Sequence, residues 1–253
     1  MNNLKHSIPS GWTEGTISEL IGRDGIFNDG DWVESKDQDP NGDVRLIQLA
    51  DIGDGNFRNK SNRYLTHDKA IELRCTFLQP GDVLVARMPD PLGRACIFPG
   101  DKKPCVTAVD VCIIRPKNHE INNNWLMYFI NSPDFRNTIE SLQSGTTRKR
   151  ISRKNLAKLI LPIPPIQEQR KIVEEVEYCF SVADESEKAV KVGIKKAGRL
   201  RQSILNKAFS GRIVPQDPED EPAAALLGRI KAEKARMTTG RKKIGERAHR
   251  KLF

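Results

Sequence analysis

The sequence contains no run of 18 apolar residues, and its first residues, MNNLKHSIPSGW, lack the apolar stretch of a secretory signal peptide. Neither membrane spanning nor export is therefore expected. The five cysteines are odd in number and include no C-x-x-C pair, which argues against a disulfide framework. Reduced thiols without an export signal indicate a cytoplasmic protein.

Catalytic and cofactor motifs are also missing. The sequence has no G-x-x-x-x-G-K-[ST] segment for ATP, no N-P-P-[YF] or D-P-P-Y segment for base methylation and no Gly-rich cofactor loop. The four histidines are scattered and none is paired with cysteine at metal-ligand spacing, so zinc is not expected. We therefore expect a chain with no cofactor, no metal and no catalytic residue.

One loose match to a metal-dependent nuclease remains as an alternative. Pro89-Asp90 followed by Asp101 and Lys103 fits a P-D…[DE]-x-K pattern, in which two carboxylates hold Mg²⁺ and the lysine steadies the attacking water. However, Asp101 and Lys103 lie in PGDKKP, where the flanking prolines favour a hairpin turn over the strand that such a site needs. Surface turn residues are the favoured interpretation.

Positive charge is concentrated in two segments. The net charge is +9, yet residues 145–160 hold six Lys or Arg and no acid, and residues 236–253 hold seven with one Glu. Each segment contributes +6, so the rest of the chain sums to −3. Such concentration favours a polyanionic partner, with a solvated surface as the alternative for 145–160 and a disordered basic tail as the favoured interpretation of 236–253.

Short β-like runs precede the helical segments. DVRLIQLADI, DVLVAR, RACIFP and CVTAVDVCIIRP are rich in Val and Ile and are separated by Gly, Pro and Asp turns. NNNWLMYFI (122–130) predicts a buried helix with Asn at its N-cap, and Ser132-Pro133 starts another through Leu142. In ISRKNLAKLIL (151–161) a brief helix is expected before a strand. Trp12 and Trp125 are expected in the core.

A heptad pattern follows the Pro164-Pro165 pair. Apolar or small residues recur at spacings of four and three, until Gly211 and Pro215 end the helix. A helix of about 40 residues would be roughly 60 Å long, which exceeds what a domain of about 160 residues can cover. The seam consists of Ile172, Val176, Cys179, Ala183, Ser186, Val190, Gly193, Ala197, Leu200 and Ile204.

Several segments resemble the DNA-specificity (S) subunits of type I restriction–modification enzymes. They are IPSGW (8–12), RLIQLADI (45–52), LQPGDVLVAR (78–87), SGTTRKRI (144–151), LILPIPPIQEQRKIV (159–173) and SILNKAFSGRIVPQDPEDEPAAALL (203–227). Together, and in this order, they extend the resemblance over nearly the whole chain, to about residue 235. Such subunits usually carry two recognition domains and two long helices, whereas this chain has length for one of each.

The strand-like runs and helical segments predict an α+β fold with a curled mixed β-sheet and short helices. The resemblance implies that residues 1–163 are a globular target-recognition domain and that a long coiled-coil helix follows at 164–211. Residues 212–253 are expected to form a short amphipathic helix and a basic tail. The implied function is non-catalytic: the chain directs adenine-N6 methyltransferase and ATP-dependent restriction subunits to a bipartite site on double-stranded DNA. The methyltransferase partner would carry S-adenosylmethionine.

The candidate DNA-binding residues are those able to contact phosphates or base edges. They are Thr146, Thr147, Arg148, Lys149, Arg150, Arg153 and Lys154 in the basic loop, Arg87 after a strand, and Arg58, Lys60 and Arg63 in GNFRNKSNRY. For Arg87 a buried ion pair is an equal alternative, and Tyr64 either stacks or packs in the core.

The heptad residues are expected to form a subunit interface rather than internal packing, because their small members allow another helix to approach closely. The expected interface residues are Ile172, Val176, Cys179, Ala183, Val190, Ala197, Leu200 and Ile204. Two copies paired antiparallel would read an interrupted palindrome. The centres of its half-sites should be no farther apart than roughly 18 base pairs, at 3.4 Å per pair. A subunit that binds partners but no DNA is a further alternative.

Overall fold

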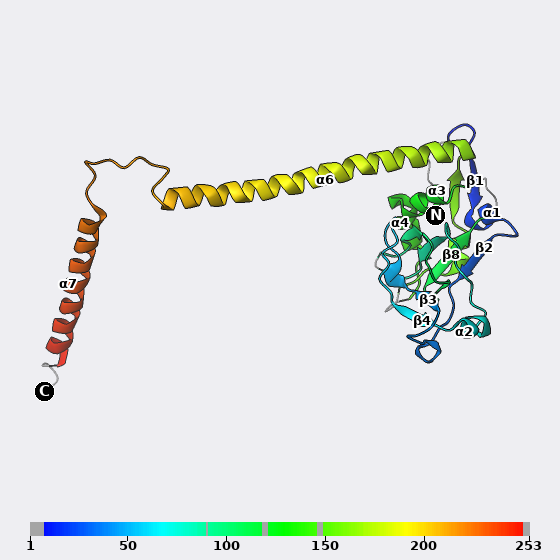
Figure 1. Cartoon of the computed structure of the whole chain (residues 1–253), viewed down its shortest axis with the longest axis horizontal. Coiled ribbons are helices and arrows are strands. Elements are labelled where there is room, and N and C mark those ends of the chain that lie inside the picture. The colour runs from blue at the N-terminus through cyan, green and yellow to red at the C-terminus, as the bar shows by residue number, and fades with distance from the viewer. Residues whose placement is uncertain (1–7, 90, 118–120, 146–148, 250–253) are drawn as a thin grey trace. The chain divides into compact units, whose positions relative to one another are not determined.

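The computed structural model describes residues 8–89, 91–117, 121–145 and 149–249, with side chains through residue 237. The chain divides into two compact units, Met1–Val182 and Ala183–Phe253. Within the described residues, the first unit combines small open sheets with short helices and the start of the long helix α6 (Figure 1). The predicted α+β class, followed by a long helix, is confirmed.

The strands of the first unit form three small sheets rather than one. A four-stranded antiparallel sheet has the order β2-β8-β5-β6, a three-stranded mixed sheet has the order β4-β3-β7, and β1 pairs with β9. The strands are three to five residues long because Gly and Pro turns interrupt the apolar runs. Their bounds are β1 Thr13–Thr16, β2 Ile26–Asp29, β3 Val44–Ile47, β4 Arg63–Leu65, β5 Val83–Ala86, β6 Ala95–Ile97, β7 Cys105–Thr107, β8 Val111–Arg115 and β9 Ile160–Ile163.

The four-stranded sheet is buried on both faces. Because side chains alternate along a strand, Val83 and Val85 of β5 enter the main core, whereas Leu84 and Ala86 enter a second cluster on the other face. Burial on both faces explains why the β5 and β8 segments read as continuous apolar runs. The main core also takes in α3 and α4; the buried Trp125 stacks on Phe129 within α3, and Phe129 contacts the tilted ring of Phe135 in α4.

Side-chain caps start the short helices where the sequence predicts them. Asn122 Oδ1 accepts hydrogen bonds from the backbone N–H groups of Asn124 and Trp125, and Pro133 occupies the first turn of α4. The short helix before β9 is present as well. The bounds are α1 Ile17–Ile21, α2 His67–Glu72, α3 Asn123–Asn131, α4 Pro133–Ser141 and α5 Arg153–Ala157, with 3₁₀ turns η1 Ser35–Asp37 and η2 Leu49–Asp51.

The helix α6 (Ile166–Phe209) is anchored through its first two turns. Gln169 is buried; its Oε1 accepts from the backbone N–H of Asn122 at 2.8 Å, and its Nε2 donates to the Pro164 carbonyl at 2.9 Å. Val173 is buried in the main core. Beyond Val176, every described side chain of α6 is exposed. Packing therefore fixes the start of the helix; farther along, the exposed Phe180 still makes an edge-on ring contact with Tyr128 of α3.

Gly211 ends α6 with a φ of +70°, the left-handed conformation that glycine adopts without strain. The second unit then contains α7 (Ala223–His249), whose first turns carry the predicted apolar residues Leu226, Leu227 and Ile230. This helix is longer than the short helix that we expected, because no proline follows Pro222 and the basic segment is rich in residues that favour helices. Among the helices of the described residues, none is long and apolar enough to span a bilayer.

A half-buried carboxylate links the start of the chain to the three-stranded sheet. Asp31 Oδ2 accepts a hydrogen bond of 3.0 Å from the backbone N–H of Thr76, and the Asp31 backbone donates to the Thr107 carbonyl at 2.7 Å. Burial raises the pKa of the Asp31 carboxyl from 3.8 to about 6. The folded protein therefore favours the protonated form, and the stability associated with it is lost as the pH rises through about 6.

Replacing Asp31 by Asn should remove this pH dependence, because the amide keeps the acceptor for the Thr76 N–H and never ionises. We expect Asp31→Asn to melt a few degrees above the original chain at pH 8 and at the same temperature at pH 4. Thermal melting across this range measures the difference, with Glu14→Gln as the control for loss of an exposed charge. A pH-independent difference would show that ionisation of Asp31 is not its cause.

Candidate nucleic-acid interface

The basic loop at 144–154 is closed at its base by Ser144 and Arg150. Their backbones exchange two hydrogen bonds, each 2.9 Å between nitrogen and oxygen. Gly145 follows with a φ of +94°, which only glycine adopts readily. The structure thus defines both ends of the loop; the predicted residues at its tip, Thr146, Thr147 and Arg148, lie outside the described residues.

The C-terminal side of the loop is anchored in the core. Ile151 is fully buried, and its backbone N–H donates to the Arg87 carbonyl at 3.1 Å. Ser152 Oγ then accepts a 3.1 Å hydrogen bond from the Asn155 N–H and caps α5. Because α5 begins directly after this cap, the next two cations stand on its first turn.

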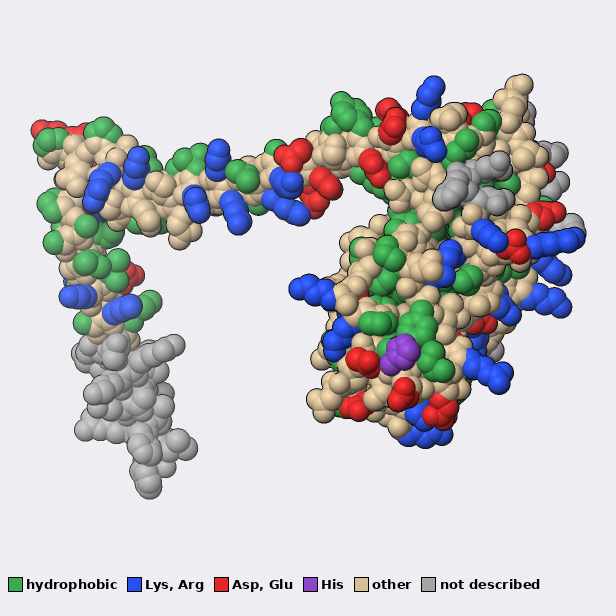
Figure 2. All heavy atoms as spheres, turned by 45° about the vertical axis from the view of Figure 1, so that its right-hand side comes forward, with side chains coloured by type: hydrophobic (Ala, Val, Ile, Leu, Met, Phe, Trp, Pro, Cys, Tyr) green, Lys and Arg blue, Asp and Glu red, His purple; other side chains and the backbone are tan. Residues whose placement is uncertain are grey.

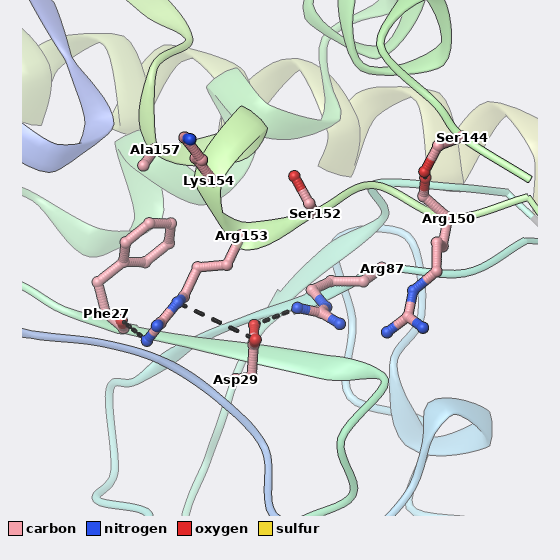
Figure 3. A pocket seen from close by; sticks show the side chains of 9 residues that line it. All are labelled: Phe27, Asp29, Arg87, Ser144, Arg150, Ser152, Arg153, Lys154 and Ala157. Carbon is pink, nitrogen blue, oxygen red and sulfur yellow. Dashed lines mark hydrogen bonds and ion pairs between the residues drawn. The ribbon is translucent and has the colours of Figure 1, made fainter.

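An open hollow of about 440 Å³ lies beside the loop (Figure 3). Four of its lining residues are cations, and one is a carboxylate, so its net formal charge is +3. Its walls come from β2, from the residue after β5, from the base of the loop and from α5. The lining residues are Phe27, Asp29, Arg87, Ser144, Arg150, Ser152, Arg153, Lys154 and Ala157.

Asp29 binds two of these cations. Arg87 is buried, 3% exposed, and its Nη1 donates to Asp29 Oδ1. Arg153 lies with its Nε 4.0 Å from Asp29 Oδ2, and its Nη1 donates to the Phe27 carbonyl at 3.0 Å. Of the two alternatives for Arg87, the buried ion pair is the one present. Arg87 and Arg153 thus tie the loop and α5 to β2.

The remaining cations of the loop face solvent. Lys149, Arg150 and Lys154 are exposed, and none has a side-chain hydrogen bond or ion pair to another described residue. Figure 3 shows the Arg150 guanidinium turned toward the hollow beside Arg87. A fixed backbone with uncommitted cations is suited to contacting a phosphate chain, because the charges need not break internal pairs to bind.

A further group of candidate DNA-binding cations lies in the loop before β4 and at the first residue of that strand. Arg58, Lys60 and Arg63 are exposed, and Arg63 Nη1 donates to Gln38 Oε1 at 3.0 Å. Tyr64 is half-buried and packs under the Lys103 ammonium, 4.5 Å from its ring centre, so it is committed to an internal contact. The structure does not bring these cations into the hollow.

The residues of the nuclease alternative do not fit a metal site. Asp101 Oδ2 accepts a 2.6 Å hydrogen bond from Arg45; although burial opposes it, this bond helps to hold the pKa of Asp101 below its ordinary value. Lys103 Nζ donates to the Gly42 carbonyl at 3.0 Å. Asp90 lies outside the described residues, and those that are described contain no group of three metal-ligating side chains. Asp101 and Lys103 therefore act as structural partners.

Most heptad residues of α6 are available to a partner. Val190, Leu200 and Ile204 are 61%, 63% and 48% exposed, and Cys179, Ala183 and Ala197 are exposed as well. Ile172 differs from the expectation, because it is half-buried and packs against the main core of its own unit. Val176 is also half-buried. The uncovered part of the seam thus begins after these two residues.

Sequence reasoning missed Asp29. Its segment, IFNDG, reads as a strand followed by a turn, and the carboxylate lies 58 residues from Arg87. No periodicity connects the two, since only the packing of β2 against β8 brings Asp29 to the end of β5. Trp125 is in the core as predicted, whereas Trp12 is half-buried.

Comparisons with known proteins agree with this arrangement. The family model described as "Type I restriction modification DNA specificity domain" matches residues 9–196. The chain is 29% identical to the type I restriction enzyme EcoBI specificity subunit of Escherichia coli, over all of this chain and 53% of that protein. It is 30% identical to the EcoKI specificity subunit of E. coli K12, over 75% of this chain and 43% of that protein.

Solved structures show the same fold. An HsdS subunit from Thermoanaerobacter tengcongensis superposes with a TM-score of 0.58 and 22% identity, over 83% of this chain and 48% of the other. A chain from a study of complex assembly in a type I R-M system superposes with a TM-score of 0.63 and 22% identity, over 84% and 49%. The chain spans about half the length of these relatives. By its sequence and its fold, it belongs to the type I restriction–modification DNA-specificity family.

Proposed function

We propose that this chain supplies the DNA specificity of a type I restriction–modification complex and has no catalytic site of its own. In this proposal residues 1–163 recognise double-stranded DNA, residues 164–211 form the assembly helix, and methyltransferase and restriction subunits are the partners directed to the site. The observation that carries it is the set of exposed cations, unpaired among the described residues, beside the hollow on an anchored backbone: Lys149, Arg150 and Lys154. The relatives, which are specificity subunits of type I restriction enzymes, support it.

The cations of the loop should contact phosphates. Replacing Arg150 and Lys154 by Ala should weaken DNA binding and flatten the plot of log K against log salt, by up to about 0.9 for each phosphate that is no longer neutralised. Binding titrations at several salt concentrations measure this slope. Lys36→Ala is the control, because it removes an exposed cation already paired with Glu34. A slope equal to that of the original chain would place the loop away from DNA.

We also propose that two copies associate through α6 in antiparallel orientation. The seam is complementary to itself in this orientation, because one alignment places an apolar or small residue opposite another at every layer. In that alignment the opposed pairs are Ile172 with Ile204, Val176 with Leu200, Cys179 with Ala197, Ala183 with Gly193 and Ser186 with Val190.

The charges of α6 favour the same orientation. Residues 168–187 hold seven acids and two cations, whereas residues 188–212 hold eight cations and no acid. Figure 2 shows the acidic side chains over the first part of the helix and the basic ones over the second. Each exposed pair contributes only about 0.2–1 kcal/mol, but an antiparallel pair opposes the acids of residues 174–187 to the cations of residues 189–202. A parallel pair opposes like charges instead.

A disulfide should report this register. Cys179 is exposed, and the other four cysteines are buried or half-buried. In Ala197→Cys, the antiparallel register places each Cys179 opposite the introduced thiol of the second copy, so mild oxidation should give a covalent dimer visible in a non-reducing gel. Lys195→Cys, on the outer face of the helix, is the control. It should form no disulfide between copies and should run as a monomer in the same gel. Cross-linking of the unaltered chain through Cys179 alone would instead indicate a parallel pair.

A homodimer also constrains the DNA site. Two-fold symmetry of the protein requires a two-fold DNA sequence. We expect methylation mapping, in cells with this chain as the sole specificity subunit beside a methyltransferase, to give an interrupted palindrome. A motif with two unrelated halves would contradict the homodimer and indicate a second, different specificity chain.

A further inference from the structure

The loop before β4 is fastened by its backbone to a buried carboxylate. Asp51 is fully buried, and its Oδ1 accepts hydrogen bonds from the backbone N–H groups of Lys60 at 2.6 Å and Ser61 at 2.7 Å. Its backbone carbonyl accepts from the Arg58 N–H at 2.7 Å. One residue thus holds the chain on both sides of Asn59. Such a loop keeps its conformation without using the side chains at its tip.

Arg45 provides a second anchor for the same loop. This residue is 7% exposed, and its Nη2 lies 3.7 Å from Asp51 Oδ1 and donates to the Ser61 carbonyl at 2.7 Å. Its Nη1 donates to Asp101. Arg45 is thus shared between Asp101 and Asp51, and its charge, together with the hydrogen bonds from Lys60 and Ser61, offsets part of the cost of burying Asp51.

Asn59 has a left-handed backbone conformation, with a φ of +51°. Asn is among the few residues with a side chain that are common in this region. The Asn59 side chain is exposed and makes no hydrogen bond with the described residues, and the same holds for Arg58. Two neighbouring residues with fork-shaped polar side chains are therefore exposed on a fixed backbone.

This loop is linked to the basic loop through the paired ends of β5 and β6, where the Ala86 N–H donates to the Arg94 carbonyl at 2.8 Å. Arg94 is buried; its Nε donates to the Ile52 carbonyl at 2.7 Å, and its Nη1 donates to the Pro91 carbonyl at 2.9 Å. On the β5 side, the Arg87 carbonyl accepts from the Ile151 N–H. Arg94 therefore holds the backbone beside Asp51, and Arg87 holds the end of the basic loop.

The two segments differ in chemistry. The basic loop presents Lys149, Arg150 and Lys154, which suit phosphates. The loop before β4 presents an arginine and an asparagine side by side, and these side chains can form bidentate hydrogen bonds with the major-groove edges of guanine and adenine, respectively. We propose that Arg58 and Asn59 read base edges and so determine part of the DNA sequence that this chain recognises. The inference rests on the proposed function.

Selection from a DNA library with randomised positions tests the inference on the full chain. Asn59→Gly deletes the amide and suits the left-handed backbone, so the fold should be preserved. Arg58→Lys keeps the charge and removes the fork. Each variant should lose roughly 5- to 150-fold of preference at a base pair of the selected motif, as expected for one bidentate pair. The salt dependence of binding should stay unchanged.

The controls separate this inference from the proposed function. The Arg150 and Lys154 double variant should flatten the salt slope and keep the motif. If the original chain selects no motif, the proposed function fails. If it selects one and both Asn59→Gly and Arg58→Lys select the same motif, Arg58 and Asn59 do not read bases. A uniform loss of affinity with a flatter salt slope would assign the segment to phosphates and overturn the inference as well.

Discussion

Ion pairs between a carboxylate and an arginine, each with at least one buried partner, are the constraint on which the loops of the globular unit depend. Asp29 pairs with Arg87, Asp51 with Arg45, and Asp82 with Arg115, whose Nε and Nη2 donate to the two Asp82 oxygens at 2.6 and 2.7 Å. An unpaired charge would be strongly unfavourable at these positions, so each pair forces its two segments together. Apart from Asp51 and Arg45, the partners are more than 30 residues apart in sequence. The strands are short, and these pairs give the connections between them a defined conformation.

This arrangement separates two tasks among the cations. Arg87, Arg45 and Arg94 are buried and hold backbone carbonyls or carboxylates, whereas Arg150 and Lys154 face solvent without side-chain partners among the described residues. The buried set gives the exposed set a fixed backbone from which to act. A preorganised surface loses less conformational entropy when it binds than a mobile one would. The same separation recurs at the loop before β4, where Asp51 holds the backbone and leaves the neighbouring side chains exposed.

The long helix follows a different principle. Its first turns belong to the core through Gln169 and Val173, while Val190 and Leu200 remain exposed. Apolar side chains in such number on one helix favour association with a second helix, because burial then removes them from water. The segregation of acids from bases along α6 adds a preference for orientation that apolar packing alone does not supply.

Features that rest on local chemistry could be predicted from the residues alone. The Asn122 cap, the Pro133 start of α4 and the helix end at Gly211 follow from neighbouring residues, and the α+β order follows from alternating apolar runs. The basic loop was recognisable because its cations are consecutive. Which of the cations are exposed depends instead on the tertiary structure. Arg87 and Arg150 are both arginines beside apolar segments, but β2 delivers Asp29 to Arg87 and leaves Arg150 facing solvent. Likewise, Ile172 fits the heptad as well as Leu200 does, and only the packing of α6 on the core commits it. Burial and pairing depend on contacts between residues far apart in the chain, which no local pattern records.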